Sequence, residues 1–116
     1  MSITADLLRG NTDIILLARL SQSDSYGYEI NKEISEITDG AFEIKEATLY
    51  SAFRRLEKNG LIESYWGNQQ TGARRRYYKI TPSGSAQLQT MVAEWEDATR
   101  LIGKLIKGET DHERTN

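Results

Sequence analysis

The chain of 116 residues contains no cysteine, one histidine and one proline. Without cysteine, no disulfide and no thiolate metal site can form. The histidine, His112, lies near the C-terminal end, where neither a nucleophile–histidine pair nor a histidine metal cluster is expected. No glycine-rich phosphate loop follows a predicted strand. We therefore expect that the protein is not an enzyme and holds no cofactor or metal.

The sequence also lacks long apolar runs, and its start lacks a basic segment followed by an apolar stretch. The first absence argues against a membrane-spanning helix, and the second argues against a secretory signal. We therefore expect a cytoplasmic protein with no membrane partner. A chain of this length is predicted to form one domain with an appended helix.

Charge is distributed unevenly, although the formal net charge is only -2. Residues 41–80 contain eight Lys or Arg and four Asp or Glu, so this segment carries +4 and the rest of the chain carries -6. A basic segment in an otherwise acidic protein is typical of a protein that binds nucleic acid through one face.

Residues 45–59 are predicted to form a helix with two different faces. The buried stripe follows the 3.6-residue period and consists of Leu49, Ala52, Phe53 and Leu56. The opposite line, called the outer line below, consists of Ala47, Ser51, Arg54 and Lys58. Small residues allow close approach, and cations favour an anionic surface, so this helix suits the DNA major groove. Gly60 is predicted to end the helix as a left-handed cap.

A β-hairpin is predicted after this helix. Residues 61–66 alternate and favour a strand, 67–72 form a polar loop, and 74–80 favour the return strand. Because neighbouring strand residues face opposite sides, one of Tyr77 and Tyr78 is expected in the core. The tip and return strand, residues 67–79, carry Arg74, Arg75, Arg76 and Lys79. A helix followed by a basic hairpin is the order of a winged helix-turn-helix, whose wing contacts flanking backbone or the minor groove.

Three further helices complete a mainly α prediction. The first spans residues 5–20 with Thr4 as N-cap, and the second spans about 26–38 with Ser25 as N-cap. Thr81 is followed by the only proline, which predicts a last helix over 82–107. We expect a DNA-binding domain over residues 1–81, a dimerisation helix over 82–108 and a disordered tail over 109–116.

The last helix carries an apolar seam spaced alternately by three and four residues, as in a heptad repeat. The seam consists of Leu88, Met91, Trp95, Ala98, Ile102 and Leu105, and it is widened by Val92, Leu101 and Ile106. This helix would be about 39 Å long, which is more than a small helical domain needs as cover. The excess predicts a partner helix, most simply from a second copy. Such a dimer would place two recognition helices ~34 Å apart on a pseudo-palindromic operator.

Four motifs resemble the PadR family of bacterial transcriptional regulators. They are Tyr26-Gly-Tyr-Glu-Ile30, Ala47-Thr-Leu-Tyr50, Arg55-Leu-Glu-Lys-Asn-Gly-Leu-Ile62 and Arg76-Tyr-Tyr-Lys-Ile-Thr-Pro-Ser-Gly84. The single last helix and Ser64-Tyr-Trp-Gly67 are most similar to the small branch that contains a multidrug-responsive repressor. The resemblance implies a dimeric winged-helix repressor that dimerises through its first and last helices and binds phenolic acids or flat drug-like molecules.

Two positions depart from the family pattern. Many members have Ser-Pro at the start of the recognition helix, where this chain has Lys45-Glu46. Lysine is a poor N-cap, and its charge opposes the helix dipole. Ala73 stands in the hairpin where proline or arginine is common. The contacts at the start of the recognition helix can therefore differ from those of the family. The geometry of the wing is left open by Ala73.

The candidate residues fall into three sets. DNA contacts are expected from Lys45, Ala47, Thr48, Tyr50, Ser51, Arg54, Arg55, Lys58, Arg74, Arg75, Arg76 and Lys79. The dimer interface is expected to include Leu7, Leu8, Ile14, Ile15, Leu88, Met91, Val92, Trp95, Ala98, Leu101, Ile102 and Leu105. A planar aromatic effector is expected to stack on Trp95, with Met91, Val92, Ala98 and Ile15 around it.

Several alternatives remain open from the sequence. Tyr50 either donates its hydroxyl to a phosphate or packs half-buried. Trp95 is either a core residue of the seam or an aromatic surface that faces its symmetry mate. The alternative function is a winged-helix protein–protein adaptor without sequence-specific DNA binding, although such an interface would normally be more apolar than the basic outer line.

Overall fold

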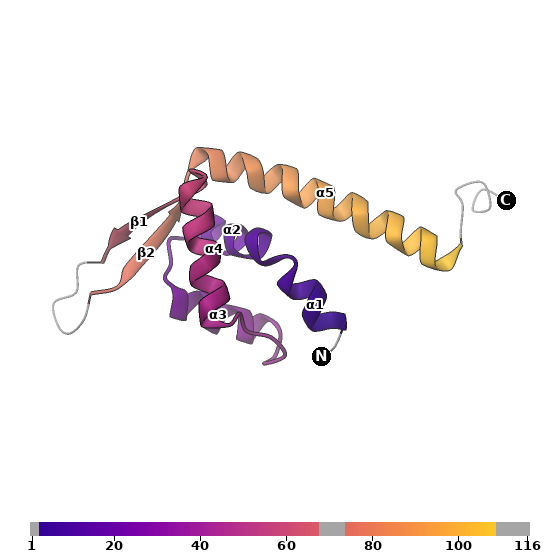
Figure 1. Ribbon diagram of the computed structural model, residues 1–116, viewed down its shortest axis with the longest axis horizontal. Helices are drawn as coiled ribbons and strands as arrows, with labels where there is room; N and C mark the ends of the chain where they lie inside the picture. The colour runs from indigo at the N-terminus through magenta and orange to yellow at the C-terminus, as the bar shows by residue number, and fades with distance from the viewer. Residues whose placement is uncertain (1–2, 68–73, 109–116) are drawn as a thin grey trace.

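Five helices and one β-hairpin form the part of the chain that the structure, a computed structural model, describes: residues 3–67 and 74–108 (Figure 1). They are α1 (Ile3–Arg9), α2 (Thr12–Gln22), α3 (Gly27–Ile37), α4 (Glu46–Lys58), β1 (Ile62–Trp66), β2 (Arg76–Ile80) and α5 (Pro82–Lys107). This is a winged helix-turn-helix with a hairpin wing and a long C-terminal helix, and it confirms the predicted fold class. The predicted tail and most of the predicted hairpin loop lie outside the described residues.

The core forms where α2, α3 and α4 meet the hairpin. The predicted stripe of α4 is buried, and the Phe53 ring stacks on Tyr78 of β2 with centroids 3.9 Å apart. Tyr78 is therefore the core member of the tyrosine pair, and Tyr77 is only half-buried. The buried hydrophobic residues are Leu16, Leu17, Leu20, Ile30, Ile34, Ile44, Leu49, Ala52, Phe53, Leu56, Ile62 and Tyr78. This core fixes α4 against α2 and the wing.

The end of α4 follows the predicted cap. Gly60 has a φ of 75°, and its N–H donates to Glu57 O at 3.0 Å. The Leu61 N–H donates to Leu56 O at 2.9 Å. These two bonds make a Schellman motif, which satisfies the last carbonyls of the helix and turns the chain into β1.

The predicted helix over residues 5–20 is wrong, because the structure has two helices there. α1 ends before Gly10, and α2 begins after Asn11. Glycine and asparagine are both weak helix formers, and side chains satisfy the carbonyls at the break. The Asn11 amide donates to Leu7 O at 2.8 Å, and the Thr12 hydroxyl donates to Arg9 O at 2.8 Å.

Two predicted N-caps are also wrong. Thr4 lies inside α1. Tyr26, in extended conformation, takes the N-cap position of α3 in place of Ser25. Ser25 instead forms a backbone bridge with Tyr78: its N–H donates to Tyr78 O at 3.2 Å, and it accepts from Tyr78 N at 2.8 Å. The segment before α3 therefore adds to the edge of the hairpin, because a strand edge offers free backbone groups.

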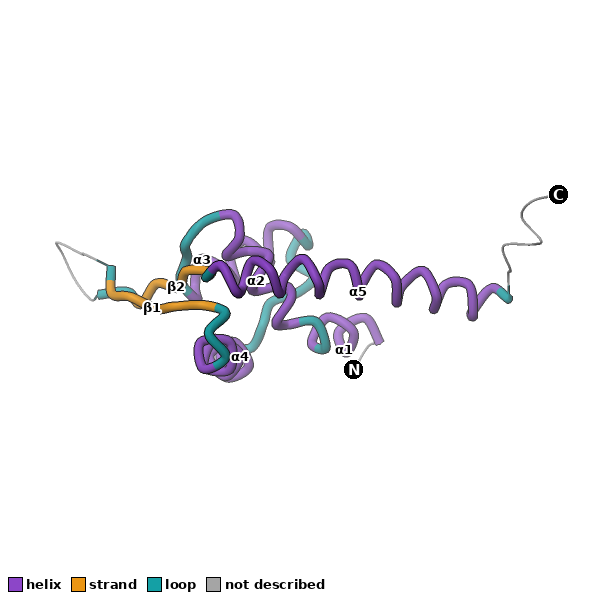
Figure 2. Tube along the Cα trace, turned by 90° about the horizontal axis from the view of Figure 1, so that it is seen from above, coloured by secondary structure: helices purple, strands orange, loops and turns teal. Residues whose placement is uncertain are grey.

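α5 spans the predicted residues and lies over α2 (Figure 2). Its start is capped as predicted, because the Thr81 hydroxyl accepts from Gly84 N at 3.0 Å. Leu88 and Met91 pack against the core, whereas the outer half of the helix projects past the other elements (Figure 1). Within the described residues, no helix is both long enough and apolar enough to cross a bilayer.

Candidate nucleic-acid interface

The predicted outer line of α4 faces solvent along its whole length. Its four residues are Ala47, Ser51, Arg54 and Lys58, and all are exposed. Lys45 precedes the helix in extended conformation, is exposed, and makes no side-chain cap bond. The first N–H groups of α4 therefore stay available for an anion, which the helix dipole favours at this end. The N-terminal half of the outer line has small side chains, which allow another surface to come close, and its C-terminal half is basic.

Two other predicted contact residues lie at the edges of this line. Thr48 is half-buried, whereas Tyr50 is 37% exposed, with its ring edge-on to Phe53 at 5.7 Å. A Cβ on Gly27 would lie 2.7 Å from the Tyr50 hydroxyl oxygen, so a glycine lets α3 approach α4 this closely. The Tyr50 ring therefore packs, and a phosphate contact by its hydroxyl stays a prediction.

Asn31 of α3 and Thr38, the residue that follows α3, hold the turn that leads into α4. The Asn31 amide donates to Ile44 O at 2.8 Å and accepts from Ile44 N at 2.8 Å. The Thr38 hydroxyl accepts from Phe42 N at 3.2 Å. Ile44 itself is buried, and the next residue is the N-cap of α4. Asn31, which is half-buried, was not among the site residues predicted from the sequence.

Arg55 lies on the flank of α4 that faces α2, outside the outer line. Its Nε donates to Asp13 Oδ2 at 3.2 Å, and a second guanidinium nitrogen contacts Asp13 Oδ1. The hydrogen bond and the charge of Asp13 raise the pKa of the Arg55 guanidinium. Arg55 therefore already has a partner on α2, and a DNA contact by this residue stays a prediction.

The wing face on the side of α4 carries Trp66 between two arginines. The guanidinium carbons of Arg74 and Arg76 lie 5.3 Å and 5.7 Å from the centroid of the Trp66 ring. Arg76 Nη2 also donates to Ser64 Oγ at 2.8 Å and lies 3.6 Å from Glu57 Oε1. Arg74 and Arg76 were among the contacts predicted from the sequence, whereas Trp66 was not. The signal that could have indicated Trp66 is its place directly opposite Arg76 in the hairpin.

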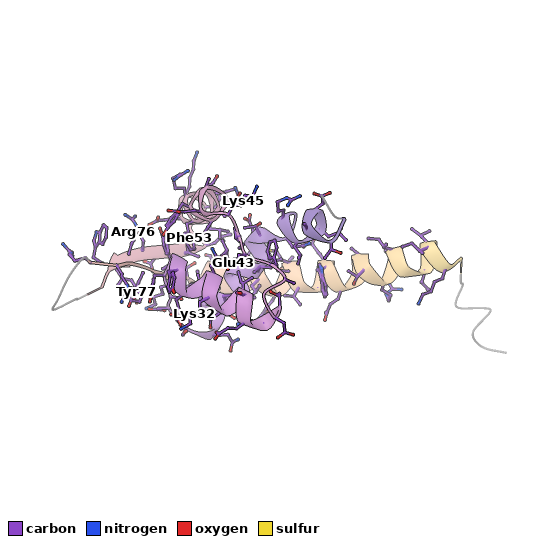
Figure 3. The ribbon with its side chains drawn as sticks, turned by 90° about the horizontal axis from the view of Figure 1, so that it is seen from below. Lys32, Glu43, Lys45, Phe53, Arg76 and Tyr77 are labelled. Atoms are coloured by element: carbon purple, nitrogen blue, oxygen red, sulfur yellow. The ribbon has the colours of Figure 1, made fainter. Side chains whose placement is uncertain are left out.

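The opposite wing face carries Arg75 and stacked tyrosines. Arg76 and Tyr77 lie on opposite sides of the hairpin (Figure 3). The Arg75 guanidinium lies 4.7 Å from the Tyr26 ring, and Tyr77 stacks on Tyr65 at 5.6 Å. The Tyr65 hydroxyl donates to Asp24 at 2.6 Å, which raises the pKa of the Tyr65 phenol. The last predicted wing cation, Lys79, is exposed on this face.

The five predicted effector residues do not all meet in one chain. Met91, Trp95 and Ala98 line a cleft of about 430 Å³ between α5 and the junction of α1 with α2. Ile15 lines a separate apolar groove of about 300 Å³ among α1, α2 and α3, and Val92 lines neither hollow. Within residues 3–67 and 74–108, no three His, Asp or Glu side chains are placed to hold a metal ion.

The helix-turn-helix formed by α3 and α4, its basic outer line and the cationic wing define a winged-helix DNA-binding protein. A family model matches residues 16–90, and the chain belongs to the PadR-like family of transcriptional regulators. It is a non-enzymatic DNA-binding regulator. This membership decides against the adaptor alternative.

Relatives agree with this assignment. A solved transcriptional regulator from Clostridium thermocellum is 50% identical, with a TM-score of 0.80 over 89% of this chain and 97% of that chain. A PadR family regulator from Eggerthella lenta is 32% identical, with a TM-score of 0.79 over 92% of this chain and 91% of that chain. An uncharacterized protein from Lysinibacillus sphaericus is 44% identical over 106 residues, or 91% of this chain and 97% of the relative.

Proposed function

We propose that the protein is a homodimeric repressor that binds a pseudo-palindromic operator and responds to a planar aromatic effector. Residues 1–81 act as the DNA-binding domain, and residues 82–108, which contain α5, act as the dimerisation helix. The assignment to the small multidrug-responsive branch is supported by the single long C-terminal helix and by the Ser64-Tyr-Trp-Gly67 motif of the wing.

The observation that carries this proposal is the exposed apolar stripe on the outer half of α5. Ile102 is 54% exposed, Leu105 80% and Ile106 79%, on a helix that projects beyond the rest of the chain (Figure 1). Contiguous exposed apolar residues mark an interaction surface, and the simplest partner for a heptad seam is the same helix in a second copy. On α1, the exposed Leu7 supports the predicted participation of this helix.

DNA contact is assigned to the outer line of α4 and to the wing. Ala47 and Ser51 would face the groove floor, where small side chains allow direct contact with base edges. Arg54 and Lys58 would lie closer to the phosphates, which set affinity and its dependence on salt. Two recognition helices related by a two-fold axis would then read the two halves of the operator.

The effector is assigned to the two copies of Trp95. This side chain is 49% exposed and lines a cleft whose charged residues are Arg9, Asp13, Arg55 and Glu94. Because Asp13 pairs with Arg55, Glu94 is the carboxylate that would attract a planar cation there, and the indole would stack on it. Release of DNA requires that the effector favour a dimer with a different spacing of the recognition helices, because equal affinity for both arrangements shifts nothing.

The decisive experiment breaks the seam and measures both assembly and operator affinity. Ile102→Asp places a charge in the proposed apolar interface, which should yield a monomer in sedimentation equilibrium. Its operator affinity should fall about 100-fold, since two-site binding is lost. Ala93→Asp puts the same charge on the opposite, exposed side of α5 and should stay dimeric. An Ile102→Asp monomer that binds the operator with full affinity would refute the proposal.

A further inference from the structure

On the side of α4, the described part of the wing carries one large aromatic side chain outside the core. Trp66 ends β1, is 53% exposed, and faces its cross-strand partner Arg76. Arg74 stands two residues before Arg76, so the same face is expected for it, and its guanidinium carbon lies 5.3 Å from the centroid of the Trp66 ring. Both guanidinium groups lie within the range of a cation–π interaction with the indole. The indole therefore contacts both arginines on this face of the wing.

The two arginines differ in what else they touch. Arg76 donates to Ser64 Oγ, and Ser64 Oγ donates in turn to Glu57 Oε2 at 2.6 Å. Glu57 lies in the last turn of α4, so its carboxylate and Arg76 join the wing to the recognition helix. The charge of Arg76 is already balanced by a carboxylate, whereas Arg74 is exposed two residues before β2 begins.

We propose that Trp66 is a positioning residue for DNA binding: it holds the Arg74 guanidinium on the α4 side of the wing, in register with the recognition helix. The wing is held against α4 by the contacts among Glu57, Ser64 and Arg76. The indole of Trp66 then orients Arg74, which lies nearer the tip of the wing. Arg74 then meets the flanking phosphates or minor groove already oriented. This inference rests on the proposed contact between wing and DNA.

The expected effect follows from preorganisation. An arginine has many rotamers, and ordering such a side chain at an interface weakens binding by roughly 2- to 10-fold. If the indole orders Arg74 before DNA binds, much of this roughly 2- to 10-fold loss of affinity is avoided. Because no charge changes, the number of phosphates neutralised should stay the same. Loss of Trp66 should therefore lower affinity without changing its dependence on salt.

The test is a double-mutant cycle between Trp66 and Arg74, measured by fluorescence anisotropy on a labelled duplex from the DNA upstream of the protein's own gene. Trp66→Leu should weaken binding about 3- to 10-fold with an unchanged salt slope. Trp66→Phe keeps an aromatic face and should weaken binding less than about twofold. Arg74→Ala should lower the salt slope by about one. In the Arg74→Ala background, Trp66→Leu should change affinity less than about twofold.

Two results would overturn the inference in distinguishable ways. An equal loss from Trp66→Leu in both backgrounds would show that Trp66 does not act through Arg74, while wing contact would stand. An Arg74→Ala variant with unchanged affinity and salt slope would remove the wing contact as well. Urea unfolding of the full-length variants shows whether a loss of affinity comes from a loss of stability. Because the Trp66 indole is exposed, the variants and the parent should have nearly equal urea midpoints.

Discussion

Replacement of Asn31 by alanine should damage both stability and operator recognition, because this side chain forms two bonds to one buried residue. The Asn31 amide contacts both the N–H and the carbonyl of Ile44, which is 4% exposed. Alanine cannot replace either bond, and water has little access to the buried backbone there. The turn into α4 would lose its attachment to α3.

The magnitude follows from these two contacts. Each hydrogen bond contributes about 0.5–1.5 kcal/mol net, and a buried backbone group left unsatisfied costs about 1–3 kcal/mol. Because a small rearrangement will let water reach one of the two groups, Asn31→Ala is expected to lower the free energy of unfolding by about 2–4 kcal/mol. The remaining folded protein should hold the start of α4 less firmly.

Urea unfolding measures the loss of stability, and it is done at a fixed protein concentration because the midpoint of the proposed dimer would depend on concentration. The matched control is Asn11→Ala, which removes an exposed bond to Leu7 O and should cost less than about 1 kcal/mol. The ratio of operator to unrelated-DNA affinity, measured where the variant is still folded, should fall for Asn31→Ala only. Equal stability losses in the two variants, with an unchanged ratio, would refute the role of Asn31.

Three further changes test other parts of the structure. In Gly84→Ala the new Cβ would clash with the backbone carbonyl oxygen of Leu61, so the free energy of unfolding measured in urea should fall by at least about 1–3 kcal/mol. Ser85→Ala, at the adjacent exposed position, should be nearly neutral. Burial raises the pKa of Tyr78 above its ordinary value of 10.0, so the stability that its neutral form contributes is present below pH 10.0 and is lost as the pH rises further. Tyr78→Phe should therefore flatten the change in urea midpoint between about pH 8 and about pH 11. Ethidium, a planar cation, should quench tryptophan fluorescence, and Trp95→Ala should weaken ethidium binding by about 1–3 kcal/mol, whereas Trp66→Phe should retain the quench. If a dimeric Trp95→Ala protein binds ethidium as tightly as the parent, Trp95 is only a core residue of the dimer interface.

Elements with strong local signals could be predicted closely from the sequence. The 3.6-residue stripe of α4 and the glycine at its end place both boundaries within one residue of the structure. Thr81 and Pro82 set the start of α5 by cap chemistry that needs no distant partner. In both helices, local propensity and tertiary packing favour the same boundaries.

Features that depend on distant partners could not be predicted in this way. Ser25 has the composition of an N-cap, yet its backbone pairs with Tyr78, 53 residues away. Helix period alone can place Arg55 on a flank of α4, but it cannot reveal that Asp13 on another helix faces it. The break at Gly10 reflects two weak helix formers in succession, which an apolar pattern over residues 5–20 conceals.

The contacts around α4 limit how an effector can act on DNA binding. One flank of α4 is tied to α2 through Arg55 and Asp13, and the other is tied to the wing through Glu57 and Arg76. Together with the buried core that α4 shares with the other helices and the hairpin, these ion pairs favour movement of the α3–α4 unit and the wing as one body. Asp13 also lines the cleft beside Trp95. A ligand in that cleft would therefore act most directly by shifting the whole DNA-binding unit relative to α5, which changes the distance between the two recognition helices of a dimer.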